Sequence, residues 1–424
     1  MLGLAGLAFA ACSSDDEVPQ MTDNTEGNVR VTLSLGRTVG TRSLGVTADG
    51  QYNLIQSLQF VFYDGSGNYV AYPLQGELNG IKYNNQTAIS EALANLNKPD
   101  THSTEVVLKD IPGSAKKLLI IANNKSTGDI NTGSLTQTQA SIIHLSEQNK
   151  NEFKVFSGEE STLSGLAESF STQQVEGKVA YNASVELRPV PSRIEVGNIT
   201  ATSAPYNYTG ADISKFKVLG YYINNFYTTG ALSAQLEPSQ RQKVDNGSDA
   251  TKYTQEAYGK LDKIGDFTFM CDEPTEGQIE YVAGETPNIW QGTTAKNEQQ
   301  ANQYWGYQIL KGDVPHIVIK LSVDYAEKGD IPAQENVVKF LTISGYKYGA
   351  AFREPFDADG DGEITTFQTG APVKYMHRGH VYKVENIVFN ANDLTEAPYE
   401  ETKNIQAMVT VSAWKGVPVT PEFQ

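Results

Sequence analysis

Cysteine, histidine and tryptophan are scarce in this sequence, and positive charge is outnumbered by negative charge. Its 424 residues include 2 cysteines, 5 histidines and 3 tryptophans. The 33 lysines and arginines stand against 50 aspartates and glutamates, so the formal net charge is −17. A surface of this sign repels phosphate backbones and anionic lipids, so we expect no nucleic-acid partner and interpret the acidity as a solubility feature. With two cysteines a disulfide framework is not expected, and Cys271 is interpreted as a lone core thiol.

The signatures of common enzymes are missing as well. No Gly-x-Ser-x-Gly elbow, Cys/His pair or phosphate-binding glycine loop occurs in a strand–turn–helix context. His377 and His380 lie three residues apart, with His316 elsewhere, but zinc needs a third ligand and a rigid frame. Trp290 and Trp305 are interpreted as core or hairpin aromatics rather than as a sugar-binding platform. We therefore expect no enzymatic activity and no cofactor.

One acidic stretch, residues 357–364, matches the first half of an EF-hand calcium loop. Carboxylates occupy loop positions 1, 3 and 5, a glycine follows at position 6, and an isoleucine stands at position 8. Position 12 is Gln368 rather than the bidentate glutamate that such loops need, and the flanks do not read as helices. A solvated hairpin turn is the preferred interpretation. The alternative is a weak calcium site formed by Asp357, Asp359, Asp361 and Glu363.

The first residues are apolar and small. Met1 to Ala11 form a run too short to span a bilayer, and Phe9-Ala10-Ala11-Cys12 loosely matches the lipobox of bacterial lipoproteins. We expect residues 1–12 to be a lipoprotein signal peptide, with Cys12 carrying lipid, palmitate included. A secretion signal without lipid is the alternative, and the missing basic region predicts a start codon a few residues upstream. Residues 13–27 are polar and acidic and are interpreted as a tether.

The next stretch has the pattern of a strand with one buried face. Its apolar residues alternate with polar ones and are followed by a flexible basic stretch, Gly36 to Arg42. The apolar positions are Val29, Val31, Leu33 and Leu35. The last twenty residues hold a second segment of this kind, which ends beside Trp414. Its apolar positions are Ala407, Val409, Val411 and Ala413.

Between these ends the chain reads as short strands with long polar connections. Strands are expected at 58–62, 106–108, 117–122, 153–156, 178–187, 193–199, 215–226, 317–323, 337–343 and 380–389. Helices are expected only at 87–96 and 135–148, the second with Ile142 and Ile143 facing inward. Pro189 and Pro191 break the pattern and suggest a boundary near residue 190. The fold class is therefore mostly β, with two β-sandwiches in series and few short helices.

Several of these stretches resemble the major fimbrillins, the stalk subunits of type V pili in Bacteroidales-type bacteria. The resemblance spans nearly the whole chain in order. It rests on the lipobox, Gly27-Asn28 opening a strand that ends at an arginine, Leu58 to Gly65, Gly113 to Asn123, Arg193 to Val196, Arg378 to Tyr382, and the tail from Met408 to Trp414. The long insertion from Tyr253 to Ala301 has no counterpart among these motifs.

This resemblance implies two transthyretin-like, Greek-key β-sandwich domains in tandem, at 43–190 and 191–403. It implies export as an outer-membrane lipoprotein precursor, and removal of residues 13–42 by an arginine-specific protease that cuts between Arg42 and Ser43, with Arg37 as the alternative site. The strand at Val29 to Leu35 would leave, and residues 404–424 of another copy would fill its place as a donor strand. The chain would then build an extracellular fimbrium for adhesion and biofilm, with tip and anchor subunits as further partners. Alternatives are a tip or anchor adhesin, a monomeric surface glycan-binding lipoprotein, or two ordinary strands of one monomer.

Overall fold

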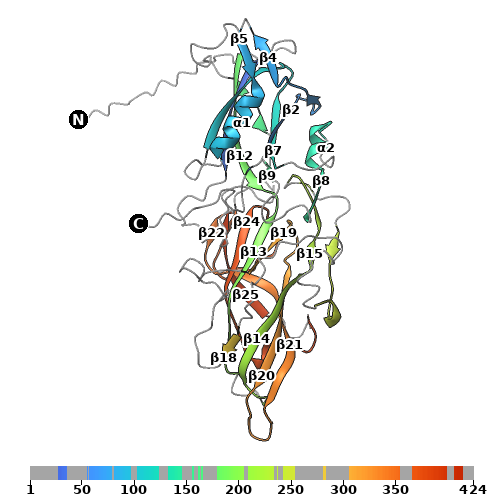
Figure 1. The fold of residues 1–424 in the computed structure, drawn as a ribbon, viewed down its shortest axis with the longest axis vertical. Helices are drawn as coiled ribbons and strands as arrows, with labels where there is room; N and C mark the ends of the chain where they lie inside the picture. The colour runs from blue at the N-terminus through green and yellow to red at the C-terminus, as the bar shows by residue number, and fades with distance from the viewer. Residues whose placement is uncertain are drawn as a thin grey trace, which may run out of the picture.

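The computed structural model describes residues 27–35, 55, 57–78, 81–96, 103–123, 132–145, 155–156, 161–162, 164–165, 179–204, 209–233, 236, 242–253, 280–282, 305–353, 365–398 and 405–413. Most of these residues lie in β-strands, which confirms the expected mostly β fold class. Two large sheets account for most of the strands and follow each other along the long axis of the molecule (Figure 1).

The first half of the chain forms a nine-stranded sheet. Its strands are β1 (Gly27–Leu35), β2 (Leu58–Tyr63), β3 (Tyr69–Val70), β6 (Ser103–Ile111), β7 (Lys117–Ala122), β9 (Val155–Phe156), β10 (Ser161–Thr162), β11 (Ser164–Gly165) and β12 (Val179–Pro189). The hydrogen-bonded order is β3-β2-β7-β9-β12-β1-β6, while β10 pairs with β7 and β11 with β12. The strand β1 therefore lies inside the sheet although it begins the described chain.

The second half forms an eight-stranded sheet. Its strands are β13 (Ser192–Ala201), β14 (Ile213–Asn224), β18 (Glu280–Val282), β19 (Trp305–Ile309), β20 (His316–Tyr325), β21 (Gln334–Tyr348), β24 (His380–Phe389) and β25 (Ile405–Ala413). Their order is β18-β14-β20-β21-β25-β24-β13-β19, so the last described strand is again an inner one.

Four small strand pairs and two helices complete the described part of the fold. The pairs are β4 (Gln75–Leu78) with β5 (Ile81–Asn84), β8 (Ile142–His144) with β16 (Thr229–Ala231), β15 (Phe226–Tyr227) with β17 (Lys243–Val244), and β22 (Phe352–Arg353) with β23 (Thr366–Phe367). The helices are α1 (Asn85–Leu96) and α2 (Leu135–Gln139), with 3₁₀ turns at Ala250–Lys252 and Ala391–Asp393.

Two hydrophobic clusters follow from the alternation along the strands. The first cluster is formed by side chains of the nine-stranded sheet and of α1. The second is formed by side chains of the eight-stranded sheet together with some from the first half of the chain. The strands β2 and β7 contribute to both clusters, because their successive side chains point to opposite faces and both faces are covered. Phe60, Phe62, Leu118 and Ile120 belong to the first cluster, and Val61, Tyr63, Leu119 and Ile121 to the second.

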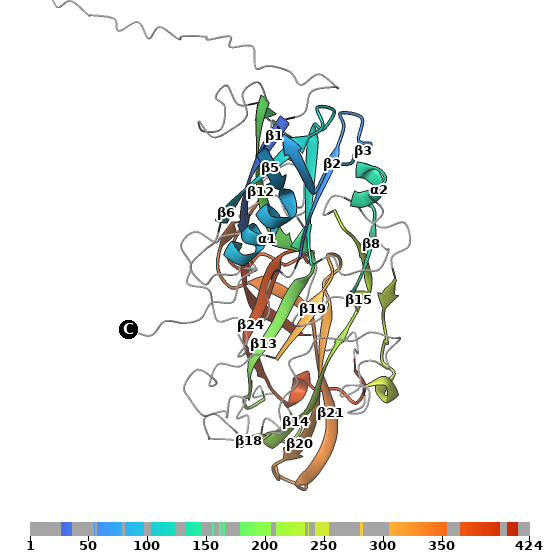
Figure 2. The ribbon, with the colours of Figure 1, turned by 45° about the horizontal axis from the view of Figure 1, so that its top comes forward.

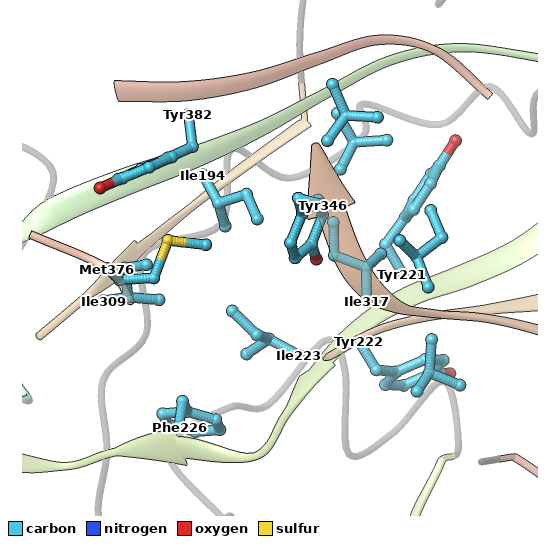
Figure 3. Packing of buried hydrophobic residues seen from close by; sticks show 14 of the residues in the cluster. Ile194, Tyr221, Tyr222, Ile223, Phe226, Ile309, Ile317, Tyr346, Met376 and Tyr382 are labelled. Atoms are coloured by element: carbon cyan, nitrogen blue, oxygen red, sulfur yellow. The ribbon is translucent and has the colours of Figure 1, made fainter. Parts of the chain in front are cut away.

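The second cluster is rich in aromatic residues. Tyr221, Tyr346 and Tyr382 are each nearly fully buried and pack among isoleucines and Met376 (Figure 3). Burial raises the pKa of Tyr221 and of Tyr346, because the phenolate would lose its hydration. The Tyr346 hydroxyl stays protonated and donates to the Pro315 carbonyl at 3.1 Å, and the Tyr382 hydroxyl accepts from the His377 N–H at 2.9 Å.

In the described part of the chain, the two halves are connected by the chain itself and by a strand pairing, in addition to the second hydrophobic cluster that they share. The chain passes from β12 to β13 through Val190 and Pro191, as the proline pair suggests, and the Gly379 N–H donates to the Pro191 carbonyl at 3.1 Å. A second connection is the pairing of β8, from the first half, with β16, from the second. The division into two domains at residue 190 stays a prediction.

The helix expected at 135–148 is wrong in its second half. The helix α2 ends at Gln139, and residues 142–144 form β8 instead. Ile143 is fully buried, whereas Ile142 is 37% exposed. Two consecutive β-branched residues favour an extended backbone when a partner strand is near, and β16 provides that partner.

Candidate functional site

The strand β1 fills a slot between two neighbours. It runs parallel to β12 and antiparallel to β6 over most of its nine residues. Val29, Val31 and Leu33 are fully buried in the first cluster. On the other face Thr32 is exposed, and Arg30 forms an ion pair with Glu105 at 3.2 Å. The apolar face of β1 is therefore part of the core, as the alternation predicts.

The strand β25 has the same length, but its neighbours are arranged differently. Residues 405–409 pair parallel to β21, and residues 410–413 pair antiparallel to β24, whereas β1 has both of its neighbours along the same residues. Ala407 is 6% exposed and Val409 is 1% exposed, while Met408 between them is 47% exposed. Both strands thus present one apolar face to a core and pair with one parallel and one antiparallel neighbour.

The slot of β1 is defined by the residues that contact its apolar face. These residues come from β6 and β12 and belong to the same buried cluster as β1 itself: Val106, Leu108, Ala183, Val185 and Leu187. A strand in this slot is supported by main-chain hydrogen bonds on both sides and by apolar side chains below it. We call this slot the β1 groove.

The described residues place only part of the predicted site. The backbone positions of Leu35, Val411 and Ala413 lie in β1 and β25, as expected from the alternation. The predicted lipid-bearing residue, the two cleavage arginines with Ser43, the calcium-loop residues and Trp414 lie outside the described part of the chain: Cys12, Arg37, Arg42, Ser43, Asp357, Asp359, Asp361, Glu363 and Trp414. Their roles, and the weak calcium site, stay predictions.

The three histidines of the second half are buried and dispersed over two strands and a loop. His377 and His380 have ring centroids 6.2 Å apart, and Nδ1 of His380 lies 2.7 Å from the Arg378 carbonyl oxygen. His316 lies on β20 beside Asn225, and its burial lowers its pKa to about 4. Among the residues that the structure describes, no group of three His, Cys, Asp or Glu side chains is placed to hold a metal ion.

Asn85 is a functional candidate that the sequence reasoning missed. It opens α1 and is 1% exposed, and its side-chain amide is hydrogen-bonded to the backbone of β6. The signal in the sequence is a pair of asparagines directly before a helical pattern, which reads equally well as an ordinary helix cap.

Within the described ranges, no helix combines the length and the apolar character that crossing a membrane requires. No known family model matches the chain, and a search of curated proteins gave no match. Solved structures do match. A candidate cell adhesion protein from Parabacteroides distasonis aligns over 94% of this chain and 99% of its own, at 13% identity and a TM-score of 0.47.

Two further structures carry names from pilus biology. A fimbrilin from Porphyromonas gingivalis aligns over 93% of this chain and 99% of its own, at 11% identity and a TM-score of 0.45. A fimbrial assembly protein from Parabacteroides distasonis aligns over 85% of this chain and 91% of its own, at 11% identity and a TM-score of 0.33. The matching structures thus include a fimbrilin, a protein of the family whose motifs the sequence resembles.

Proposed function

We propose that this protein is a structural subunit of a cell-surface pilus that polymerises by strand exchange. The precursor is exported as a lipoprotein through Cys12 and cut by an arginine-specific protease after Arg42. The strand β1 then leaves, and the segment Ile405–Ala413 of another copy enters the β1 groove. The observation that carries this proposal is the match between β1 and β25 in length and in the alternation of buried and exposed residues.

The energetics favour refilling the β1 groove once it is empty. Burying a valine or leucine side chain contributes about 1.5–3 kcal/mol, and β1 buries three such side chains. Each ladder hydrogen bond adds about 0.5–1.5 kcal/mol. An empty groove would also leave backbone groups of β6 and β12 without partners, which makes it a template for another strand.

The joint made in this way is open-ended. The groove lies in the first sheet of one copy and the donor in the second sheet of the next copy, so the two contacting surfaces differ. A heterologous contact that does not close into a ring extends into a filament. The function is therefore structural rather than enzymatic, and the partners are other copies of the chain, tip and anchor subunits, and the maturation protease.

In the monomer β25 is already paired, through its first half with β21 and through its second half with β24, and Val409 is buried. Donation therefore competes with this internal pairing, and the exchange needs β25 to detach first. The apolar face of β25 cannot be buried in its own monomer and in the β1 groove of another copy at the same time. We therefore expect polymerisation to be slow, and slower still when the acceptor's β1 groove is occupied.

A pair of cysteines tests the exchange. Glu105 lies on β6 opposite Thr32 of β1, and Met408 lies on the exposed face of β25, as Thr32 does in β1. A strand seated in the β1 groove would carry Met408 past β6, so Glu105→Cys with Met408→Cys should give crosslinks between copies, and only after cleavage. The control pair joins Glu105→Cys with Val388→Cys, an exposed position on β24, and should give none. Crosslinks within one chain, or none after cleavage, contradict the proposal.

A further inference from the structure

The outer edge of β6 is covered by a side chain that pairs as a strand would. The Lys109 N–H donates to Oδ1 of Asn85 at 2.9 Å, and Nδ2 of Asn85 donates to the Lys109 carbonyl at 3.0 Å. An antiparallel neighbour makes this pair of bonds to one residue of a strand edge. The primary amide can do the same, because it presents an acceptor and a donor side by side, as a peptide group does.

Asn85 is held firmly in this position. Its Nδ2 also donates to the Pro73 carbonyl at 2.7 Å, and its backbone N–H donates to the Leu74 carbonyl at 2.7 Å. With 1% of its surface exposed, the side chain has no route to water that would let it exchange these partners. The contact therefore ties the β6 edge to the start of α1 and to the segment before β4.

This edge lies at one end of the nine-stranded sheet, and β3 lies at the other. β6 is the last strand in the order of the nine-stranded sheet, and α1 packs beside it (Figure 2). The backbone groups of successive residues point alternately to the two sides of a strand, so Val107 and Glu105 face outward in step with Lys109. An uncovered edge of this length is a template on which a strand from another molecule can add.

We propose that Asn85 is a specificity-determining residue for strand addition. It blocks the outer edge of β6, so that a strand from another copy is accepted in the β1 groove, on the inner side of the same strand, and not on its outer side. The part of this proposal that concerns the strand accepted in the β1 groove rests on the proposed function. The block at the outer edge of β6 does not, because it applies to the uncleaved chain as well.

The chemistry of the position explains why asparagine suits it. Aspartate would keep an acceptor for the Lys109 N–H but would place a carboxylate against the carbonyl oxygens of Lys109 and Pro73. Alanine would remove both bonds to Lys109. We expect both changes to loosen the cover of the edge, by repulsion in one case and by deletion in the other.

The test uses the full uncleaved chain, in which β1 fills its groove and strand exchange cannot occur. Asn85→Ala and Asn85→Asp are compared with Asn84→Ala, which removes an exposed helix cap to the Thr87 N–H and leaves Lys109 untouched. Analytical ultracentrifugation should show the wild type and Asn84→Ala as monomers and both Asn85 variants as dimers or larger species. With Glu105→Cys added, the Asn85 variants should form disulfide-linked dimers through β6.

Circular dichroism identifies which Asn85 variants are folded, and only a folded variant is used to ask whether loss of the Asn85 contact causes association. If the folded variant stays monomeric up to the highest soluble concentration, the proposal is overturned. It is also overturned if Asn84→Ala associates equally, since helix fraying would then be the cause. A failure of cleaved wild-type protein to polymerise would count against the proposed function and leave this result unchanged.

Discussion

The hydroxyl groups of Tyr63 and Thr138 lie 2.5 Å apart and share a hydrogen bond in the interior of the protein. Tyr63 ends β2, and Thr138 belongs to α2, directly before the strand β8 that pairs with the second half. This contact therefore ties β2 to the segment that leads into β8.

Removing either hydroxyl should destabilise the protein. Tyr63→Phe and Thr138→Val are each expected to lower the free energy of unfolding by about 1 kcal/mol. The double variant should lose less than the sum, because both changes delete the same bond. Chemical denaturation of the four proteins measures this coupling, and additive losses would show that the two hydroxyls act separately.

The same tyrosine predicts how stability responds to alkaline pH. Burial raises the pKa of Tyr63 to about 12, while its hydrogen bond to Thr138 acts in the opposite direction. The unfolded chain releases this proton near pH 10, so the folded state binds more protons between pH 10 and 12. Stability should therefore be intact below pH 10 and decline above it, and Tyr63→Phe should make that decline shallower in thermal melts.

His316 predicts the response to acid. Its burial lowers its pKa to about 4, whereas the unfolded chain takes up this proton near pH 6.5. The stability that it contributes is present above pH 6.5 and is lost as the pH falls toward 4. Thermal melts of His316→Gln should show a weaker pH dependence over this window than those of the wild type. An unchanged slope would contradict this assignment.

Charge on the apolar face of β25 should stop donation. Val409→Asp would bring a carboxylate against the floor of the β1 groove, at a cost of several kcal/mol, about the penalty of burying an unpaired charge. Met408→Asp, on the exposed face, should assemble normally. A cleaved Val409→Asp subunit still has an open groove, so small amounts added to wild-type subunits should shorten fibres in electron micrographs. Fibres of unchanged length would argue against β25 as the donor.

Cleavage should precede assembly and produce one defined end. Arg42→Gln should remain uncut and monomeric, and N-terminal sequencing of wild-type fibres should begin at Ser43. Arg37→Gln is the matched control and should mature normally. A sequence beginning at Thr38 would move the site to Arg37, and fibres of uncut Arg42→Gln would remove cleavage from the proposal.

The sequence predicted best those strands whose burial follows from the order of apolar and polar residues within the strand itself. Alternation predicted β1 and the apolar face of β25, and the run Lys117 to Ala122 predicted the buried strand β7 with the bounds that the structure shows. Pairing partners depend on distant segments and could not be read in this way. The parallel contact of β1 with β12 and the pairing of β8 with β16 are of this kind. Asn85 was missed for the same reason, since its partner Lys109 lies 24 positions away.

The pairing of β8 with β16 bears on how the molecule would carry mechanical load. A single covalent passage at Val190 and Pro191 would behave as a hinge, about which the two sheets could bend and rotate under tension. The pairing of β8 with β16, bonded at Leu145 to Thr228 and at Leu232 to Ser141, adds a second link between the halves, beside the hydrophobic cluster that they share. We therefore expect the two halves to resist bending about the covalent passage, so that a pulling force would pass from one sheet to the other within each copy.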